Sequence, residues 1–445
     1  MSNTLTLQEP TVNPDAMASR LNEEQGEHLQ IVPQRTRLLI VGDAAVKTGF
    51  ARVIQSIFEP LQHVYEIHHL GINYLGDPHD YPWPIYPAMN GGDRFGVGRL
   101  KALVERLRPS LVFIVYDIWT LGDYMRELAD YTDPLKVVLY CPIESGPIDP
   151  AFIVRLAGAH RLVSYTQFGK QQLEQAIDQA HQHRPDLRLP PVEVIPHGVD
   201  TQRFFPLPPA PSRNNPKSGR LQARKMLWPT LTDNEDAFIV LNANRNQPRK
   251  RIDLTIEGFA LFAKDKPAHV RLYLHMGVED LGWNILKLAH RLGIDDRLIL
   301  SGLTHTIPSI SDEQMNLVYN ACDVGLNTAS SEGWGLVSFE HAATGAAQVM
   351  TGHGVTRELW QGAAELVDPA LSLLEPMTLT EAHIVTPQGV ADALERLYQD
   401  REYLAQRQTA AYHNAANPAY SWQQIARDWE RLFAQTLTED QRKTS

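Results

Sequence analysis

Residues 37–61 read RLLIVGDAAVKTGFARVIQSIFEPL, and this stretch decides the fold class. The apolar run at residues 38–41 is typical of a buried strand, and Gly42 closes it. A short irregular loop follows, and the pattern of residues 50–61 predicts a helix. A buried strand that leads into a helix is the repeating unit of a parallel α/β sheet, so further units of this kind are expected along the chain.

The alternation of strands and helices continues on both sides of a change in composition. Buried strands are predicted in the first part at residues 64–70, 111–116, 137–141, 162–165 and 192–195. Residues 206–217, PLPPAPSRNNPK, are rich in proline and asparagine, which is typical of a linker. Strands are predicted in the second part at residues 238–241, 270–275, 298–300 and 324–326. The fold class is therefore α/β, with two Rossmann-like domains whose parallel sheets place their strand ends at an interdomain cleft.

Composition narrows the possible functions. The 445 residues include 41 basic and 52 acidic side chains, which give a formal net charge of −11. This charge argues against a protein that coats nucleic acid through a generally basic surface. The two cysteines, Cys141 and Cys322, are too few for a disulfide framework or a zinc module. The longest apolar runs are far shorter than the ~18 residues that span a bilayer, and the first residues lack a signal-peptide pattern. A cytoplasmic enzyme without a transmembrane segment is expected.

The loop between Gly42 and Gly49 is the first candidate for ligand binding. It follows a strand and opens a helix, where free backbone N–H groups attract anions. It is not a Walker A loop, because Lys47 precedes its glycine instead of following one. A plain strand-to-helix turn accounts for the loop about equally well, so both interpretations stay open.

A second candidate is residues 244–253, NRNQPRKRID, which follow the first strand of the second part. Four cations lie close together here, namely Arg245, Arg249, Lys250 and Arg251. The forked donors of Arg and the point charge of Lys suit a diphosphate. A solvated basic turn is the alternative, since charge runs are usually surface features.

A third candidate is residues 331–340, SEGWGLVSFE. Gly333 and Gly335 allow the backbone to approach a ligand closely, and the amides after Glu332 are expected at a helix N-terminus, which suits phosphate. Glu340 follows one to two turns later, so both carboxylates can face one pocket and accept hydrogen bonds from sugar hydroxyls. Two glutamates on a solvated helix face are the alternative, but the apolar setting argues against it.

The E-x7-E spacing from Glu332 to Glu340 resembles the signature of the retaining GT-B glycosyltransferases of the glycosyl transferases group 1 superfamily. Arg245 and Lys250 are similar to that family's diphosphate-binding Arg and Lys, five positions apart. Residues 194–200, VIPHGVD, resemble the end of its first domain. Together these motifs resemble the family over most of the chain.

The resemblance implies a GT-B fold and a division of this chain into domains. A first, acceptor-side domain is expected at residues 36–205, completed by a terminal helix at residues 419–445 that crosses back to it. Residues 236–418 would form the second domain, which binds the nucleotide-sugar. Residues 206–235 are predicted as the linker between the two, and residues 1–35 as a mobile N-terminal tail.

The resemblance also implies a reaction. A sugar would move from a nucleotide-diphosphate-sugar, such as a UDP- or GDP-sugar, to an acceptor with retention of the anomeric configuration and without a metal or another cofactor. Arg245 and Lys250 would hold the leaving diphosphate and stabilise the charge that develops on it. Glu332 would contact hydroxyls of the donor sugar, and Glu340 would contact the ribose.

Backbone groups complete the donor site that the resemblance implies. The amides that would contact the sugar and the phosphates are those of Gly333, Trp334, Gly335, Leu336 and Val337. The loop from Gly42 to Gly49 would approach the phosphates or the acceptor from the first domain.

Two departures from the family pattern bear on catalysis. Many relatives carry a His or an Asp after the fourth strand of the first domain, where this chain has Glu144 within residues 140–147, YCPIESGP. A carboxylate there could stabilise an oxocarbenium-like centre, so Glu144 is a further catalytic candidate. A glycine often follows the diphosphate-binding Lys, and Arg251 takes its place here.

Two other functions stay open. One is a GT-B-shaped epimerase or hydrolase of sugar nucleotides, which would turn over its substrate without an acceptor. The other is a nucleotide-sugar-binding scaffold that has lost catalysis. The acceptor is open among a glycan, a lipid, a protein, a small molecule and a nucleic acid, and the long aromatic segment at residues 73–99 is expected to shape its binding side.

Overall fold

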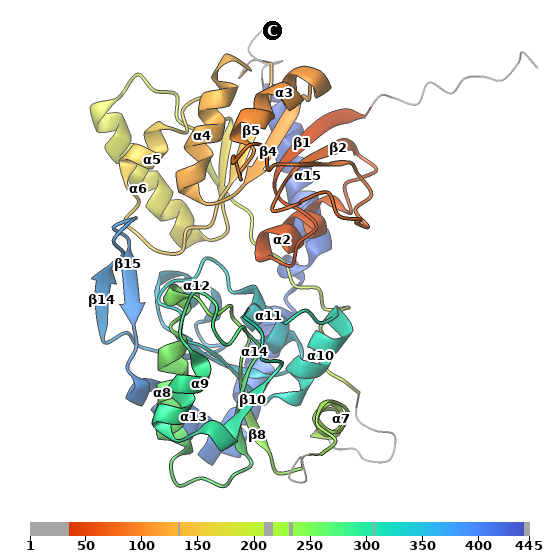
Figure 1. The fold of residues 1–445 in the computed structure, drawn as a ribbon. Coiled ribbons are helices and arrows are strands. Elements are labelled where there is room, and N and C mark those ends of the chain that lie inside the picture. Colours follow the sequence, from red (N-terminus) through yellow and green to blue (C-terminus); the bar gives the residue numbers. More distant parts are fainter. Residues whose placement is uncertain (1–34, 132–133, 209–216, 231–234, 306–307, 440–445) are drawn as a thin grey trace, which may run out of the picture. The chain divides into compact units, whose positions relative to one another are not determined.

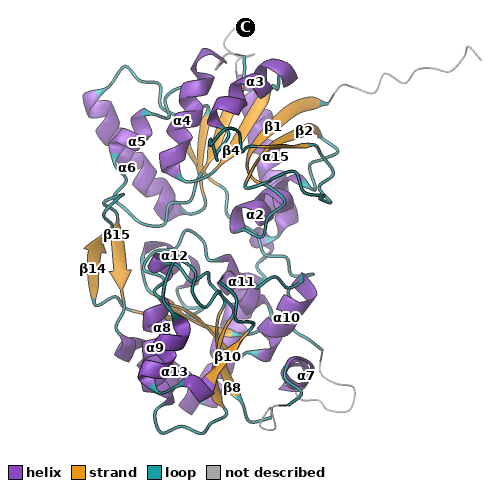
Figure 2. Cartoon of the chain, viewed as in Figure 1, coloured by secondary structure: helices purple, strands orange, loops and turns teal. Residues whose placement is uncertain are grey.

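The computed structural model describes residues 35–131, 134–208, 217–230, 235–305 and 308–439. Two parallel sheets flanked by helices make up most of this part of the chain (Figure 1). Figure 2 shows the strands of each sheet enclosed by helices, as expected for parallel sheets that are buried on both faces. The predicted N-terminal tail lies outside the described residues, apart from Arg35.

The first sheet has seven parallel strands in the order β3-β2-β1-β4-β5-β6-β7. Its strands are β1 (Thr36–Asp43), β2 (Tyr65–Ile72), β3 (Ile85–Pro87), β4 (Leu111–Val115), β5 (Lys136–Tyr140), β6 (Arg161–Ser164) and β7 (Val192–Val194). Its helices are α2 (Gly49–Phe58), α3 (Val97–Leu107), α4 (Ile118–Leu128), α5 (Pro150–Val154) and α6 (Gln167–His183). Leu38 and Ile40 of β1 face the cluster that includes α2, and Leu39 and Val41 face the cluster that includes α3 and α4. Both faces are covered, which explains the unbroken apolar run of this strand.

The second sheet has six parallel strands in the order β10-β9-β8-β11-β12-β13. Its strands are β8 (Phe238–Asn242), β9 (Val270–Leu274), β10 (Leu298–Leu300), β11 (Val324–Asn327), β12 (Ala347–Thr351) and β13 (Glu365–Val367). Its helices are α8 (Ile252–Ala263), α9 (Ile285–Leu292), α10 (Asp312–Ala321), α11 (Leu336–Ala343), α12 (Gly354–Trp360), α13 (Pro387–Gln399) and α14 (Arg401–Ala415). The predicted α/β fold class with two Rossmann-like sheets is confirmed.

In each sheet the strand order reverses between two paired central strands, β1 and β4 in the first and β8 and β11 in the second. Connections leave such a pair in opposite directions, so a crevice forms beyond the carboxyl ends of its strands. Asp43 and Asp117 come at or just after the ends of the first pair. Lys250 and Glu332 come after the ends of the second pair. The candidate residues therefore lie where open α/β sheets bind their ligands.

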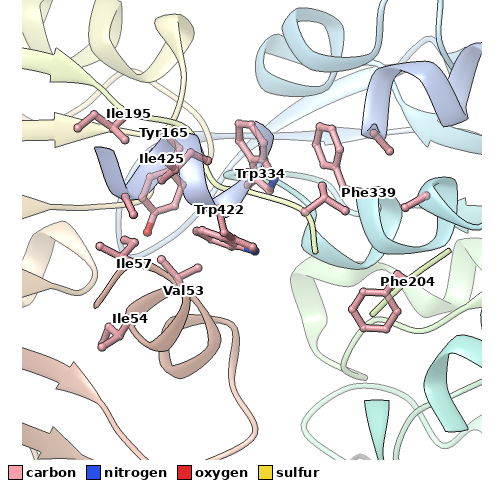
Figure 3. Packing of buried hydrophobic residues seen from close by; sticks show 14 of the residues in the cluster. Val53, Ile54, Ile57, Tyr165, Ile195, Phe204, Trp334, Phe339, Trp422 and Ile425 are labelled. Carbon is pink, nitrogen blue, oxygen red and sulfur yellow. The ribbon is translucent and has the colours of Figure 1, made fainter. Parts of the chain in front are cut away.

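Helix α15 (Trp422–Thr438) comes last among the described elements, but it packs against the first sheet. Its Trp429 ring lies 5.0 Å from the Phe113 ring of β4, and its Phe433 ring lies 6.0 Å from the Phe58 ring of α2. Figure 1 shows α15 beside α2. The same buried cluster includes Trp334, and Figure 3 shows it near Trp422 at the start of α15.

Several elements differ from the sequence-based expectations. A helix, α7 (Lys217–Leu227), lies within the predicted linker, and its buried Arg224 donates to the Ala321 carbonyl at 2.8 Å. A hairpin of β14 (Leu371–Leu374) and β15 (Glu381–Ile384), and the short strand β3, were not predicted. Strand β1 continues to Asp43, so the expected end at Gly42 is wrong. The domain boundaries themselves stay a prediction.

Candidate functional site

A buried ion pair between Lys250 and Glu332 lies at the centre of the candidate site. The Lys250 ammonium donates to Glu332 Oε2, and each residue is 7% exposed. Asn327 Nδ2 donates to the same oxygen at 3.4 Å. Burial alone would raise the pKa of Glu332, but the charges of Lys250 and Arg249 outweigh burial and lower this pKa to about 2. Glu332 is therefore an anion at neutral pH, with oxygens that can accept hydrogen bonds from hydroxyl groups.

The loops after β8 and β11 hold this pair by hydrogen bonding to each other. Lys250 ends the short 3-10 turn Pro248–Lys250. The Ser330 amide donates to the Arg249 carbonyl at 2.8 Å, and Thr328 Oγ1 donates to the Arg251 carbonyl at 2.8 Å. Because β8 and β11 are neighbours in the sheet, their loops bring together two charges that are 82 positions apart in the sequence.

Arg249 connects the ion pair to the loop that follows β5 of the first sheet. The expected position of this loop after the fourth strand is wrong, because the unpredicted strand β3 makes β5 the fifth strand along the chain. Its Nη2 lies 3.1 Å from Glu144 Oε1, and its Nη1 donates to the Ser331 carbonyl at 3.2 Å. A Cβ placed on Gly333 would lie 3.2 Å from Pro142 Cβ and 3.6 Å from Glu144 Cγ. The structure therefore brings Glu144 close to the backbone around Glu332, as a joint site requires.

The other two cations of the basic segment have partners of their own. Arg245 makes a bidentate contact with Asp280, with distances of 2.6 Å and 3.1 Å. Arg251 makes a similar contact with Asp253, at 3.1 Å and 2.7 Å. Arg251 is thereby held by the start of α8. The guanidinium group of Arg245 is half-exposed, so a diphosphate could take the place of Asp280 as its partner.

Glu340 lies inside α11 and has different partners from Glu332. Arg52 Nη1 of α2 lies 3.2 Å from Glu340 Oε1, and the Tyr319 hydroxyl donates to Oε2 at 3.0 Å. Burial raises the pKa of Glu340, and the Arg52 charge opposes this effect. Arg52 also contacts Asp312 of α10 at 2.8 Å. The two glutamates of the E-x7-E motif thus have separate sets of polar partners, which fits separate contacts with a sugar and a ribose.

The N-terminus of α11 provides the backbone donors. Gly335 has φ +88°, a left-handed conformation that favours glycine, and the helix begins at the next residue, Leu336. Within the described part of the chain, no side chain hydrogen-bonds to this helix start, so the first N–H groups, including that of Val337, can serve an anion. A Cβ placed on Gly49 would lie 3.6 Å from Leu336 Cδ1, which puts the two predicted loops in contact.

Two predicted donor-binding residues have clear packing roles. The Trp334 ring is 2% exposed and stacks on Phe339 at 4.8 Å, so its indole belongs to the core (Figure 3). Gly42 lies inside β1, where a Cβ would come within 2.6 Å of Ile54 Cδ1 and 2.9 Å of Val115 Cγ1. Close packing therefore accounts for this glycine, and its contact with a donor stays a prediction.

Sequence reasoning missed Asp117 and Arg52. Asp117 follows β4 at the reversal of strand order in the first sheet, and its carboxylate does not cap the helix that it precedes. Burial and the nearby charge of Glu144 raise the pKa of Asp117 to about 7. Its position directly after the apolar run at residues 111–116 is a signal that could have identified it. Nothing in the sequence near Arg52 indicates its pairing with Glu340.

The described residues hold neither a membrane-spanning helix nor a cluster of metal ligands. None of the helices there combines the length and apolar character needed to cross a bilayer. No group of three or more His, Cys, Asp or Glu side chains in that part of the chain is placed to hold a metal ion.

Comparison with known proteins gives partial sequence matches. No family model matches the chain. Mannosylfructose-phosphate synthase of Agrobacterium fabrum is 27% identical over 170 residues, which cover 37% of this chain and 33% of the relative. D-inositol 3-phosphate glycosyltransferase of Salinispora tropica is 26% identical over 297 residues, which cover 65% of this chain and 54% of the relative. The chain thus spans a third to about half of the length of these curated relatives.

Solved structures match over nearly the whole chain. Sucrose-phosphate synthase from Thermosynechococcus elongatus gives a TM-score of 0.66 at 16% identity, covering 91% of this chain and 100% of that one. Anabaena Alr3699/HepE in complex with UDP and glucose gives 0.64 at 15% identity, covering 90% and 100%. The GT-B fold is confirmed by these structures, and the resemblance to the group 1 glycosyltransferases is confirmed by the curated relatives.

Proposed function

We propose that this chain is a glycosyltransferase that moves a sugar from a nucleotide-diphosphate-sugar to an acceptor hydroxyl, with retention of the anomeric configuration and without a metal. The observation that carries the proposal is the buried pair of Lys250 and Glu332, flanked by Arg249 and Glu144. It combines cations for a leaving diphosphate with carboxylates for hydroxyl groups, at the strand ends where α/β sheets bind ligands.

The relatives support this assignment of the donor. The curated relatives are named as a synthase of a sugar phosphate and as a glycosyltransferase, and one structural neighbour holds UDP and glucose. A UDP-sugar or a GDP-sugar is therefore the first donor to test. The second domain, residues 236–418, would bind this donor, and the first domain, residues 36–205 with the terminal helix, would bind the acceptor.

In the proposed reaction, the chain acts by positioning and by neutralising charge. Lys250 would leave Glu332 and bind the diphosphate. Arg245 would likewise leave Asp280 and bind the diphosphate. Glu332, freed from Lys250, would accept hydrogen bonds from the sugar hydroxyls, while Glu340 would accept them from the ribose. Attack from the face of the leaving group would pass the acceptor proton to the departing phosphate, so a strong protein base is not needed.

The direct test is product analysis with a panel of nucleotide-sugars, with and without acceptors. We expect release of a nucleoside diphosphate and a product whose anomeric configuration, determined by NMR, equals that of the donor. Chelator-treated enzyme should keep its activity. An inverted product, or no transfer to any acceptor, would refute the proposal.

The alternatives predict different results in the same assay. An epimerase or a hydrolase would convert the nucleotide-sugar equally well without an acceptor. An inactive scaffold would bind the donor but release no diphosphate from it. The cytoplasmic location is also part of the proposal, and it fits the two buried free thiols, Cys141 and Cys322.

A further inference from the structure

A cavity of about 240 Å³ lies beside the candidate site. Loops from both sheets line it, together with the turn of the hairpin β14–β15. Glu144, Arg249 and Ser331 all belong to its wall, and Ser331 directly precedes Glu332. The cavity therefore adjoins Glu144 and Arg249, which flank the group that we propose to hold the donor sugar, and an acceptor hydroxyl must approach near this group.

The wall of this cavity is mostly apolar away from the reacting groups. Trp119 and Phe152 contribute aromatic surface from the first sheet, and Met377 contributes from the hairpin turn. Trp119 is 47% exposed and Met377 is 91% exposed, although both are large apolar side chains. Neighbouring leucines of the hairpin are exposed as well, at Leu371, Leu373, Leu374 and Leu379. Large apolar side chains that are exposed beside a cavity are typical of a binding site.

The hairpin is a fixed part of the wall. The Glu381 amide donates to the Gly146 carbonyl of the first sheet's loop at 2.8 Å, and the His383 amide donates to the Ser330 carbonyl at 2.8 Å. These two bonds tie β15 to the loops that carry Glu144 and Glu332. The apolar turn is thus held at the cavity by the same loops that form the candidate site.

The charged side chains of the wall disfavour an anionic ligand. Four carboxylates belong to it, those of Asp117, Glu144, Asp149 and Glu375. Arg249 is the single cation among the lining residues, and it is already paired with Glu144 at 3.1 Å. A phosphate in this cavity would face unbalanced negative charge, whereas a neutral alcohol would find hydrogen-bond acceptors near the reacting centre and apolar surface beyond it.

We propose that the acceptor is an uncharged small-molecule alcohol that carries an alkyl or aryl group, with its hydroxyl near Asp117 and Glu144 and its apolar group between Trp119 and Met377. This inference rests on the proposed glycosyltransferase function. In the transfer, the acceptor oxygen forms a bond to the anomeric carbon while the bond from that carbon to the diphosphate oxygen breaks. The acceptor proton leaves with the diphosphate.

Three matched acceptors test the proposal with the 445-residue chain: glucose, glucose 6-phosphate and octyl β-glucoside. With an active nucleotide-sugar, diphosphate release should show the lowest KM for octyl β-glucoside and the highest KM for glucose 6-phosphate. Met377→Gln and Trp119→Gln should each raise the KM for octyl β-glucoside about five- to tenfold. Met226→Gln is the matched control, because Met226 is also an exposed methionine, on α7 and outside the cavity wall. Preference for glucose 6-phosphate, or equal effects of the three variants, would overturn the proposal.

Saturation-transfer NMR separates this inference from the proposed function, because it needs no turnover. The octyl protons should receive saturation from wild-type protein and lose most of it in Trp119→Gln. If this contact is present but no nucleotide-sugar reacts, the acceptor site stands and the proposed transfer fails. Equal transfer in wild type and Trp119→Gln would refute the cavity assignment. Binding to phosphatidylcholine vesicles that depends on Met377 would also refute it, since the apolar turn would then belong to a lipid surface.

Discussion

Replacing Lys250 with methionine tests the centre of the site most directly. Methionine keeps much of the apolar length of the side chain and removes the charge, so the Glu332 carboxylate stays buried without its main partner. The pKa of Glu332 is lowered from 4.5 to about 2, because the charges of Lys250 and Arg249 outweigh burial. An acid with a lowered pKa stabilises the fold above the unfolded-state pKa, and this contribution is lost as the pH falls toward the folded-state value.

The size of the effect follows from the burial of the pair. Removing one partner of a buried ion pair costs about 3–5 kcal/mol at neutral pH, and burial also lowers the pKa of Lys250, which places this pair at the lower end of that range. We therefore expect Lys250→Met to lower the free energy of unfolding by about 3 kcal/mol at pH 7 and by much less at pH 3. The double variant Lys250→Met/Glu332→Gln should recover most of the loss at pH 7, because no charge then stays buried alone.

Urea unfolding followed by tryptophan fluorescence measures these differences. Lys225→Met is the control, because Lys225 forms an exposed ion pair with Glu235 at 3.7 Å, whose loss should be close to neutral. Both variants that lack Lys250 should also lose sugar transfer, even where the fold is restored. If Lys250→Met unfolds like the wild type at pH 7, or if the double variant is no more stable than the single one, the coupling described for this pair is wrong.

Three further outcomes are expected. Asp117→Asn should raise the free energy of unfolding by up to about 4 kcal/mol at pH 8.5 and leave it unchanged at pH 3, because a pKa raised to about 7 means that folding disfavours the charged carboxylate. An equal gain at both pH values in urea unfolding would contradict this. Gly42→Ala should lower the free energy of unfolding by about 1–3 kcal/mol, because the added methyl group would contact Ile54. The affinity for UDP, measured by calorimetry, should stay unchanged. A loss of affinity without a loss of stability would instead support a contact between Gly42 and the donor. Arg245→Lys should weaken diphosphate binding about tenfold, because lysine lacks the two-donor guanidinium group that contacts Asp280. Unchanged binding of UDP and GDP in calorimetry would exclude a role for Arg245.

Much of the fold could be predicted because buried parallel strands are unbroken apolar runs. The run at residues 38–41 and those at residues 111–116 and 238–241 all become central strands. Some of the elements that were missed lack this signal. Helix α7 lies in polar sequence and depends on tertiary contacts of Arg224, and the strands of the hairpin β14–β15 have little buried surface.

The candidate site could be predicted as separate segments but not as an assembly. Spacing identified Lys250 and Glu332 separately, yet their ion pair depends on the pairing of β8 with β11. The contact of Arg52 with Glu340 joins α2 to α11, and no local pattern encodes it. Asp117 gains its raised pKa only from burial and from Glu144, which is brought near it by the fold.

The placement of α15 has a consequence for how the chain is made. The aromatic side chains of Phe58 and Phe113 are completed as a core by Trp429 and Phe433, which a ribosome adds only after the whole second sheet. During synthesis the first sheet therefore emerges with one face partly uncovered, and it stays so until α15 has left the exit tunnel. The helices of the second sheet end with α14, which is translated before α15. The sheet that is translated first is therefore completed last.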